Sequence, residues 1–327
     1  MSIILRGIDF GSVFTASGTL NFFGQGYPYH KYYKLIPGFS FNGSTFVAKT
    51  TTIFSRAGNM PLDEDLQPKE FRPKCIYVDF LKGLGLNAVS LSGPGAQKLL
   101  ATGLWQEREK PFFISFMAVG ANKLERLEEL RKFCWLLNFT EFRIRFGLEI
   151  NLSCPNTKHN PKDLITEAAE MIKIANYILK NIPIIIKISV LIDPLMIKQI
   201  IAESNCDAVA VSNTIPWGQL PDKIDWEGLF GSKISPLQEF GGGGFSGKHL
   251  LTLVRDWISE ARNCGIETPI IGGGGIFCKK DVATIKYAGA DAIFIGTVAM
   301  LRPWRVQGII NYANKIYQEG GARCIEL

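Results

Sequence analysis

The chain has 327 residues, of which 46% are hydrophobic and 20% are charged, and its formal net charge is +6. This length has room for one large α/β barrel or two average domains, and the composition is that of a globular protein with a sizeable core. The modest charge, without a dense basic block, gives no reason to expect a nucleic-acid partner. No apolar run approaches the roughly 20 residues that a membrane helix needs.

The seven cysteines are scattered along the chain and include no Cys-x-x-Cys spacing. An odd, dispersed set predicts free thiols in a reducing compartment rather than a disulfide framework or a zinc site. The N-terminal segment is too short for a secretory signal. These features predict a soluble, cytoplasmic protein without a metal centre.

Short apolar segments recur along the chain, each followed by Gly, Pro or Asn or by a helical pattern. Their continuous apolar character is typical of strands that are covered on both faces. The strands predicted in this way are Phe46–Thr50, Phe112–Val119, Leu148–Ser153, Ile184–Val190, Ala208–Asn213, Pro269–Gly272 and Ala292–Gly296.

Helices are predicted between these strands from caps and apolar stripes. Asn160-Pro161 and Asp193-Pro194 each supply a cap residue and a first-turn Pro ahead of an apolar stripe. A third stripe runs from Leu250 to Ala261 and ends before Gly265. Such stripes are far more often core packing than cofactor sites, and they are interpreted here as core.

Alternating strands and helices over this length predict a parallel sheet, and about seven or eight strands fit a closed (β/α)8 barrel of the TIM type. A doubly wound open sheet is the alternative, although no G-x-G-x-x-G turn follows the first strand. The glycine-rich stretch Phe240–Gly244 is the candidate for the remaining strand. Residues 53–110 are predicted to form an insertion after the first barrel strand, within a single domain of residues 1–327 that starts with a short β segment.

The densest chemistry follows the apolar run that ends at Ile150, in the sequence Asn151-Leu152-Ser153-Cys154-Pro155-Asn156. Asn donates to and accepts from planar, amide-like ligands, and Cys acts as a base or nucleophile once deprotonated. The carboxyl ends of strands are where α/β enzymes bind ligands. The structural alternative is a strand-to-loop turn rich in Asn and Pro.

Glycines gather late in the chain, at 243–247, at 272–275 and at Gly296-Thr297. The last two sets follow consecutive predicted strands, where barrels often bind a phosphate through backbone N–H groups. Glycine permits a close approach of the backbone, and Thr297 adds a hydroxyl donor. Ordinary turns are the alternative explanation for each set taken alone.

Two lysines stand in or at the end of apolar strands, Lys187 within Ile184–Ile188 and Lys49 before Thr50. A lysine in a buried strand is costly unless it meets an anion. The anion is either a structural carboxylate or an anionic cofactor. Asn213-Thr214 adds an amide and a hydroxyl at the end of another strand, so one barrel mouth would collect all these groups.

With these residues assembled, the chain resembles the dihydroorotate dehydrogenases, which are FMN-bearing (β/α)8 barrels. The resemblance rests on the 151–156 motif, the Lys49 strand, Ile186-Lys187, the Gly-Gly-Phe-Ser-Gly segment at 243–247 and Gly296-Thr297. It extends from about Ser12 to about Ala313. Phe14-Thr15-Ala16-Ser17-Gly18 resembles the family's entry segment, which contacts the flavin.

The resemblance implies a role for each matching position. Cys154 would be the base that removes the C5 proton of dihydroorotate while hydride leaves C6 for the flavin, and Lys49 would lie close to both flavin and substrate. Flavin-binding residues would be Ala16, Ser17, Gly18, Lys49, Thr50, Asn151, Lys187, Gly247, Gly274, Gly275, Gly296 and Thr297. Substrate-binding residues would be Lys49, Leu84, Gly85, Leu86, Asn151, Asn156, Asn213 and Thr214. A Cys at position 154 is typical of the family's soluble members, and the resemblance implies a homodimer while the electron acceptor stays open.

One position departs from the family pattern, because Lys82 stands where an Asn normally helps to bind the pyrimidine. Lys82 either binds an orotate carboxylate or points to solvent, or the substrate differs. Two further hypotheses therefore stand beside the dehydrogenase: a flavoenzyme that acts on the C5–C6 bond of another pyrimidine, and a diverged flavin-binding subunit. The retention of Cys154 argues against the second of these.

Overall fold

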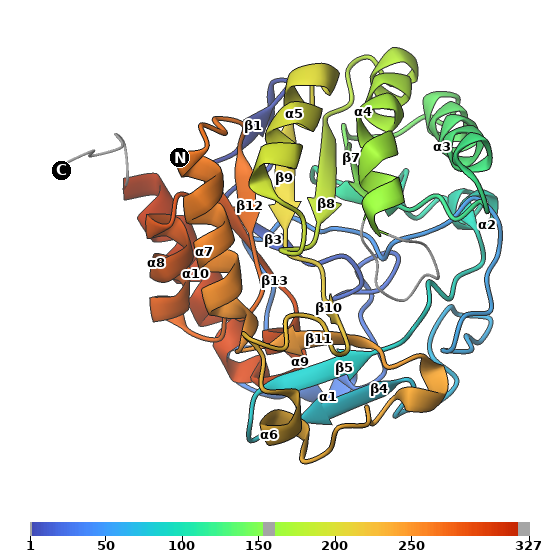
Figure 1. Ribbon diagram of the computed structural model, residues 1–327. Coiled ribbons are helices and arrows are strands. Elements are labelled where there is room, and N and C mark those ends of the chain that lie inside the picture. Colours follow the sequence, from blue (N-terminus) through green and yellow to red (C-terminus); the bar gives the residue numbers. More distant parts are fainter. Residues whose placement is uncertain (1, 153–160, 320–327) are drawn as a thin grey trace.

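The centre of the molecule is a seven-stranded parallel sheet in the order β3-β13-β12-β9-β8-β7-β6 (Figure 1). The computed structural model describes residues 2–152 and 161–319, with only the backbone described at 161–166. The strands are β3 (Val13–Thr15), β6 (Phe113–Phe116), β7 (Gly147–Asn151), β8 (Ile184–Ile188), β9 (Ala208–Val211), β12 (Ile270–Gly272) and β13 (Ala292–Ile295).

Residues 45–51 join the two edges of this sheet. On one side the backbone N–H of Thr15 donates to the carbonyl oxygen of Thr45 at 2.9 Å, and the Phe14–Thr45 bridge is parallel. On the other side the N–H of Ala48 donates to the carbonyl oxygen of Phe113 at 2.9 Å. The sheet and this segment thus form an α/β barrel of the TIM type, and the open doubly wound alternative is excluded.

Helices cover the outside of the barrel and pack against one another largely in chain order (Figure 1). Asp193 caps one of them, because its side chain accepts a 2.8 Å hydrogen bond from the N–H of Leu195. The longer helices are α3 (Lys123–Asn138), α4 (Pro161–Ile178), α5 (Pro194–Ser204), α7 (Leu250–Asn263), α8 (Lys279–Tyr287) and α10 (Val306–Glu319). The short ones are α1 (His30–Tyr33), α2 (Ala96–Leu100), α6 (Trp226–Phe230) and α9 (Thr297–Leu301), with the 3-10 turns Gln238–Phe240 and Pro303–Arg305. None of the described helices is long and apolar enough to cross a bilayer.

The amino end of the barrel is closed by a hairpin of β1 (Ile4–Leu5) and β2 (Ile8–Asp9). Phe10, which follows the hairpin, is 1% exposed, and its ring centre lies 4.5 Å from that of Phe113. The hairpin and the inward side chains of the strands form one hydrophobic cluster, which includes Ile3, Leu5, Ile8, Phe10, Phe14, Val47, Phe113 and Ile185. The expected N-terminal β segment is therefore a plug for the barrel.

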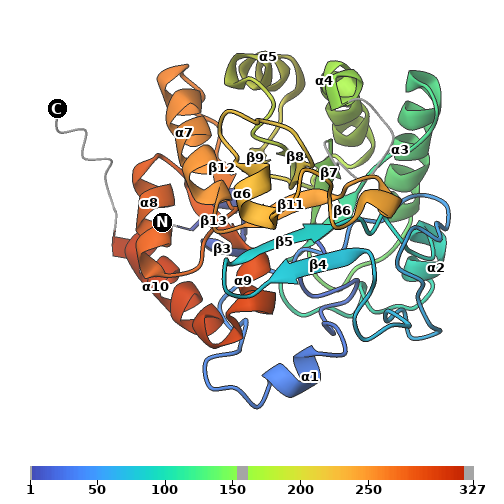
Figure 2. The same ribbon diagram turned by 60° about the horizontal axis from the view of Figure 1, so that its bottom comes forward.

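A four-stranded antiparallel sheet lies across the other end of the barrel, toward which β8 and β9 point (Figures 1 and 2). Its order is β10 (Ile215–Pro216), β11 (Gly244–Gly247), β5 (Leu84–Asn87) and β4 (Ile76–Asp79). Two separate excursions of the chain build it, since β4 and β5 precede β6 and the other two strands follow β9. We call this sheet the roof.

The barrel confirms the predicted parallel architecture, but two assignments were wrong. Phe240–Gly244 is not a barrel strand: Phe240 ends a 3-10 turn, and Gly241–Gly243 adopt positive φ before β11 joins the roof. The missing barrel strand is β3, which pairs with β13. Because β3 precedes it, the segment Phe46–Thr50 is the second barrel segment in chain order, and residues 53–110 with β4, β5 and α2 come after that second segment.

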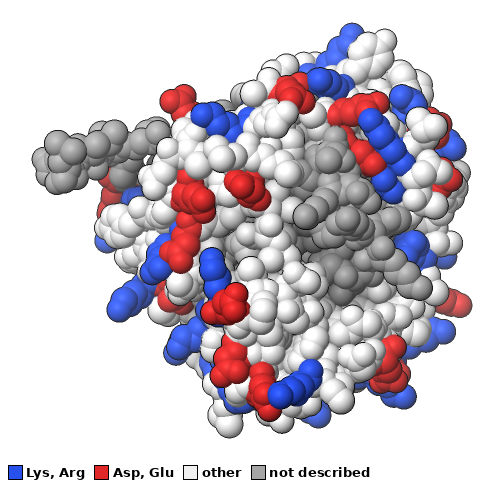
Figure 3. Space-filling model, viewed as in Figure 1, with Lys and Arg blue, Asp and Glu red and all other residues white. Residues whose placement is uncertain are grey.

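Basic and acidic side chains are interspersed over the described surface in Figure 3. On that face the described residues form no extended patch of one sign, of the kind that nucleic acids bind. Uncharged residues predominate near its centre.

Candidate active site

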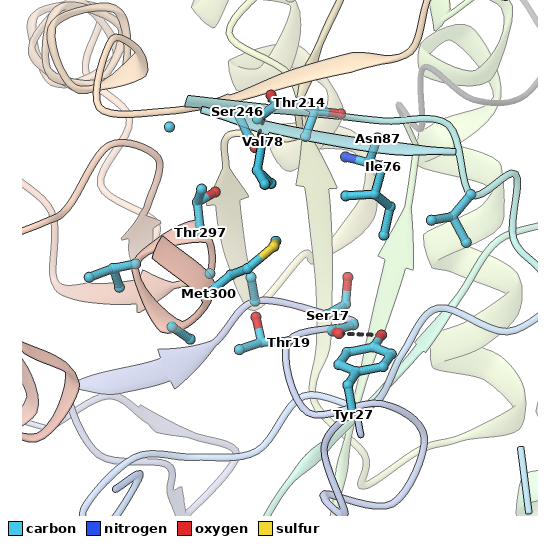
Figure 4. A pocket seen from close by; sticks show the side chains of 18 of the residues that line it. Ser17, Thr19, Tyr27, Ile76, Val78, Asn87, Thr214, Ser246, Thr297 and Met300 are labelled. Atoms are coloured by element: carbon cyan, nitrogen blue, oxygen red, sulfur yellow. Dashed lines mark hydrogen bonds between the residues drawn. The ribbon is translucent and has the colours of Figure 1, made fainter. Parts of the chain in front are cut away.

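A large cavity, of about 800 Å³, lies between the roof and the carboxyl ends of the barrel strands. Its size falls within the range of small-molecule and cofactor sites. Figure 4 shows side chains entering it from both sides. From the roof come Ile76, Val78, Asn87 and Ser246, and from the segments after β3 and β13 come Ser17, Thr19, Tyr27, Thr297 and Met300.

The pairing of β4 with β5 decides which roof side chains face this cavity. Ile76 lies opposite Asn87, and Val78 lies opposite Gly85. Residues paired across antiparallel strands point to the same face, and neighbours along a strand point to opposite faces. Leu84 accordingly packs into the hydrophobic core and is 0% exposed. The roof thus presents the Asn87 amide to the cavity beside apolar side chains.

Two buried lysines reach the cavity from inside the barrel. Lys49 is 6% exposed; its Nζ donates to the carbonyl oxygen of Ser92 and lies 4.5 Å from the centre of the Phe22 ring. Lys187 is 5% exposed, and its Nζ donates to Ser17 Oγ at 3.1 Å. Neither lysine joins an ion pair between described residues. A structural carboxylate partner for Lys187 is therefore absent from the described part of the chain.

The buried charges of the barrel do not balance. Burial lowers the pKa of the Lys49 ammonium to about 7, because the low-dielectric interior disfavours its charged form. Arg126 and Glu167 pair with each other between α3 and α4, which leaves Glu149 on β7 as the buried carboxylate of the described barrel interior. Below a pH of about 7, two ammonium groups stand against one carboxylate and leave a positive excess, and a bound anion would favour the charged form of Lys49 above that pH. Such an interior favours an anionic ligand.

A ladder of amides crosses the cavity floor. Asn213 Nδ2 donates to Asn151 Oδ1 at 2.8 Å, and Asn151 Nδ2 donates to Thr50 Oγ1 at 3.2 Å. These bonds join the end of β9, the end of β7 and the 45–51 segment. Because each amide is fixed by its neighbour, the ladder presents its donors and acceptors in a defined orientation.

The glycine segments form one side of the cavity. Gly247 has φ +121°, and a Cβ there would lie 2.7 Å from the Cα of Leu84. Gly275 has φ +82°, and a Cβ there would lie 2.8 Å from the carbonyl oxygen of Lys248. Only glycine fits such positions without strain, so the backbone itself lines the cavity beside Thr297 at the start of α9.

Comparisons with known proteins agree with this architecture and this cavity. The family model described as dihydroorotate dehydrogenase matches residues 5–316. The chain belongs to the dihydroorotate dehydrogenase family. A relative from Oceanobacillus iheyensis, named dihydroorotate dehydrogenase B (NAD(+)), catalytic subunit, is 27% identical over 340 residues, which cover 100% of this chain and 96% of the relative. A protein of the same name from Listeria welshimeri is 28% identical over 293 residues, covering 86% and 82% of the two chains.

Solved structures of the family share the fold. Ligand-free DHODH from Eimeria tenella gives a TM-score of 0.69 at 19% identity, covering 98% of this chain and 88% of that one. The complex of the Eimeria tenella DHODH with ferulenol gives 0.67 at 18% identity, covering 98% and 85%. At these identities the likeness concerns the fold alone.

The cavity brings together the residues that the family resemblance selects. Each of the following lines it: Ala16, Ser17, Gly18, Lys49, Thr50, Asn151, Lys187, Gly247, Gly274, Gly275, Gly296 and Thr297. Gly85, Leu86, Asn213 and Thr214 also line it. Leu84 does not, because its side chain lies on the core face of β5. Cys154 and Asn156 lie outside the described residues.

Lys82, the departure from the family pattern, is turned away from the cavity. Its Nζ donates to the backbone carbonyl oxygens of Leu229 and, at 3.4 Å, of Gly228. These carbonyls belong to the last turn of α6, where a cation is favourable. In this arrangement Lys82 holds α6 to the turn between β4 and β5 and does not contact a ligand in the cavity.

Several lining residues were missed by the sequence reasoning. Tyr27 donates from its hydroxyl to the carbonyl oxygen of Gly18 at 2.6 Å, and burial raises its pKa. His30 accepts a 3.2 Å hydrogen bond at Nδ1 from the N–H of Tyr27, and burial lowers its pKa to about 4. The His30 imidazole is therefore neutral near pH 7. The run of tyrosines from Tyr27 to Tyr33 was the available signal, while Asn87 and Ser246 had none beyond their place in short strands.

Proposed function

We propose that this protein is an FMN-dependent dihydroorotate dehydrogenase that oxidises dihydroorotate to orotate in pyrimidine biosynthesis. The observation that carries the proposal is convergence: residues chosen from distant parts of the sequence line one cavity at the carboxyl end of the barrel. Family membership and the names of the relatives support the same activity. In this proposal residues 1–327 act as a single flavin-binding domain.

The residues of the cavity fit FMN on three counts. The positive excess of Lys49 and Lys187 over Glu149 suits an anionic group. The backbone of Gly247 and Gly275 lines the wall beside Thr297, which suits a phosphate and its ribityl chain. Lys187 would lie beside the flavin's N1/O2 edge, as the resemblance implies. When bound, FMN supplies the acceptor for the hydride that leaves C6 of the substrate.

Cys154 would take the C5 proton of dihydroorotate. A free thiol has a pKa near roughly 8.5, so a thiolate base is accessible close to neutral pH. Two described cysteines do not suit this role, because burial raises the pKa of Cys134 and of Cys206 to about 12. If the proton is removed while the hydride leaves, no unsupported carbanion forms.

The amide ladder would orient the pyrimidine ring. Asn151 and Asn213 are already fixed by hydrogen bonds, so their side chains lose little conformational entropy when a planar ligand binds. Thr214 adds a hydroxyl to the same wall, and Asn156 completes the set in the proposal. The Lys49 ammonium would meet the substrate's carboxylate and flavin together.

The relatives' name includes NAD(+) and a catalytic subunit, which favours NAD(+) as the final electron acceptor of a larger assembly. We extend this to the present chain as part of the proposal. The proposal includes a homodimer of the chain. It also places the protein in the cytoplasm, in keeping with its scattered cysteines.

The deciding experiment is an anaerobic titration of the FMN-reconstituted protein with L-dihydroorotate, followed by the visible absorbance of oxidised flavin. Bleaching in proportion to added substrate is the expected result. Flavin that binds but stays oxidised would support FMN as the cofactor and refute dihydroorotate as the substrate. A protein that binds no FMN would refute the proposal as a whole.

A further inference from the structure

A carboxylate that forms no ion pair with a described residue lies beneath the cavity. Glu149 on β7 is 4% exposed, and Ser115 Oγ donates to its Oε1 at 2.6 Å. None of the ion pairs between described residues includes it. A buried carboxylate that has a hydroxyl donor but no described cation to neutralise it is unfavourable for folding. The fold therefore retains Glu149 at a cost to its stability.

Hydroxyl groups link this carboxylate to the cavity wall. Ser115 Oγ lies 2.9 Å from Thr50 Oγ1, which lies 3.2 Å from Ser17 Oγ. Ser17 Oγ in turn accepts the 3.1 Å hydrogen bond from Lys187 Nζ. Thr50, Ser17 and Lys187 line the cavity, whereas Glu149 and Ser115 do not. Glu149 is thus held just below the wall, at one end of a polar chain whose other end is an ammonium group.

Proton counting limits how the hydroxyl groups of this chain can share their protons. A hydroxyl has one proton and two lone pairs. Ser115 uses its proton on the Glu149 carboxylate, so the contact between Ser115 and Thr50 is donated by Thr50. Thr50 Oγ1 also lies within donating distance of Ser17 Oγ, at 3.2 Å, so its one proton is shared between Ser115 and Ser17, and Ser17 Oγ accepts from Lys187 in either case. A continuous run of hydroxyl groups therefore connects the Glu149 carboxylate to the Lys187 ammonium.

We propose that Glu149 is a positioning residue whose negative charge sets the reduction potential of the flavin in this cavity. The inference rests on the proposed function, because the group it acts on is FMN. Reduction adds negative charge to the cavity. The Lys187 and Lys49 ammonium groups favour that charge, and the Glu149 carboxylate opposes it through a medium of low dielectric constant. Glu149 therefore holds the potential lower than the two lysines alone would set it, and reduced flavin gives up its electrons more readily.

The test is the flavin midpoint potential of the holoenzyme, measured by equilibration with a reference dye, in wild type and in Glu149→Gln. Gln keeps the shape and an acceptor for Ser115 but carries no charge. The potential of the variant is expected to be more positive. Equal potentials with FMN bound in both proteins would overturn the inference. Should Glu149→Gln not fold, Glu149→Met removes the charge without burying an unpaired polar group, and the same shift is expected.

Two control variants separate charge from structure. Ser115→Ala removes the hydrogen bond to the carboxylate and keeps the carboxylate itself, so the potential should shift far less than in Glu149→Gln. A shift in Ser115→Ala as large as that in Glu149→Gln would show a structural effect and overturn the electrostatic role. Glu167→Gln neutralises an equally buried carboxylate that pairs with Arg126 outside the barrel, and it should lose stability with no change in potential. Loss of FMN binding in the wild type would refute the proposed function instead, before any potential is compared.

Discussion

The two ends of the barrel are built from the same strands and have opposite character. At the amino end, the inward side chains and the N-terminal hairpin form a hydrophobic plug around Phe10, Phe14 and Phe113. At the carboxyl end, the inward side chains are lysines, amides and hydroxyls around a cavity of about 800 Å³. On β8 the change from apolar to polar occurs between two successive inward-facing residues, Ile185 in the plug and Lys187 at the cavity.

This difference shows how a barrel separates stability from chemistry. Inward positions recur every second residue of a strand, about 7 Å apart, so one substitution moves a position from packing to binding. The lower layer stabilises the fold by burying apolar area, and the upper layer holds buried polar groups whose unfavourable burial is offset by hydrogen bonds and ligands. The predictions that follow ask whether the two layers are as separate as the structure indicates.

The largest kinetic effect is expected at the carboxyl end. Cys154→Ala should slow the reduction of flavin by dihydroorotate at least ~100-fold, the usual scale for loss of a general base, in a stopped-flow anaerobic experiment. Cys206→Ala is the matched control, because Cys206 lies just before β9 at the amino end and is buried. The control should lose some thermal stability and keep its rate. Unchanged kinetics in Cys154→Ala would exclude Cys154 as the base.

The largest effect on stability is expected at the plug. Phe10→Ala should lower the free energy of unfolding by about 3–5 kcal/mol, because it leaves a cavity against Phe113 in a closely packed layer. Urea unfolding followed by fluorescence measures it. The folded variant should bind FMN with wild-type affinity. A large loss of FMN affinity without a loss of stability would mean that the two layers are not separate.

Lys49 makes anion binding depend on pH. Its pKa of about 7 means that the ammonium form, which attracts an orotate carboxylate, is lost as pH rises through 7. Affinity for orotate should fall above that pH by up to about tenfold per pH unit until the ligand-bound pKa is reached. Lys49→Met should bind weakly at every pH, and the exposed Lys98→Met should behave as wild type. A visible difference titration from pH 6 to 9 measures this, and an unchanged slope in Lys49→Met would assign the pH dependence elsewhere.

The same lowered pKa affects stability without ligand. Between pH 7 and 10.5 the unfolded chain binds a proton at Lys49 that the folded protein does not. The ligand-free protein should therefore gain stability as pH rises across this window, and Lys49→Met should reduce that gain.

The smallest effect is expected at Lys82. Lys82→Asn restores the amide that the family pattern has at this position, yet the KM for dihydroorotate should change less than about twofold because the side chain is directed at α6. Loss of its bonds to the carbonyls of α6 should cost about 1 kcal/mol of stability or less. A marked fall in KM would mean that position 82 reaches the substrate after all.

The parts of the fold that the sequence predicted are those with a continuous apolar signal. Strands such as Ile184–Ile188 are buried on both faces and stand out for that reason. β3 was missed because Val13–Thr15 has three residues, too few for a pattern. The glycines at 241–243 carry no side chains and so no periodicity, which led to a strand where the backbone turns. The roof strands pair across long stretches of sequence, and no local signal records such pairing.

The residues of the site also differ in whether the sequence carried a local signal for them. Lys49 and Lys187 were predictable because a cation inside an apolar strand requires an explanation. Asn87 faces the cavity only because β5 pairs with β4 in one register, and a shift by one residue would bury it. The family pattern marked Lys82 as a departure but could not predict where its side chain points. That direction depends on α6, which is distant in sequence.

The roof has a consequence for how the protein can be altered. Gly244 pairs with Asn87 and Ser246 with Gly85, so two chain segments separated by most of the barrel share one set of backbone hydrogen bonds. A chimaera that takes residues 76–87 from a relative and leaves residues 215–247 in place would keep the backbone ladder but change the side chains that lie opposite one another across it. The two segments form one exchangeable module, and substrate range in this protein should be transplanted by moving both together.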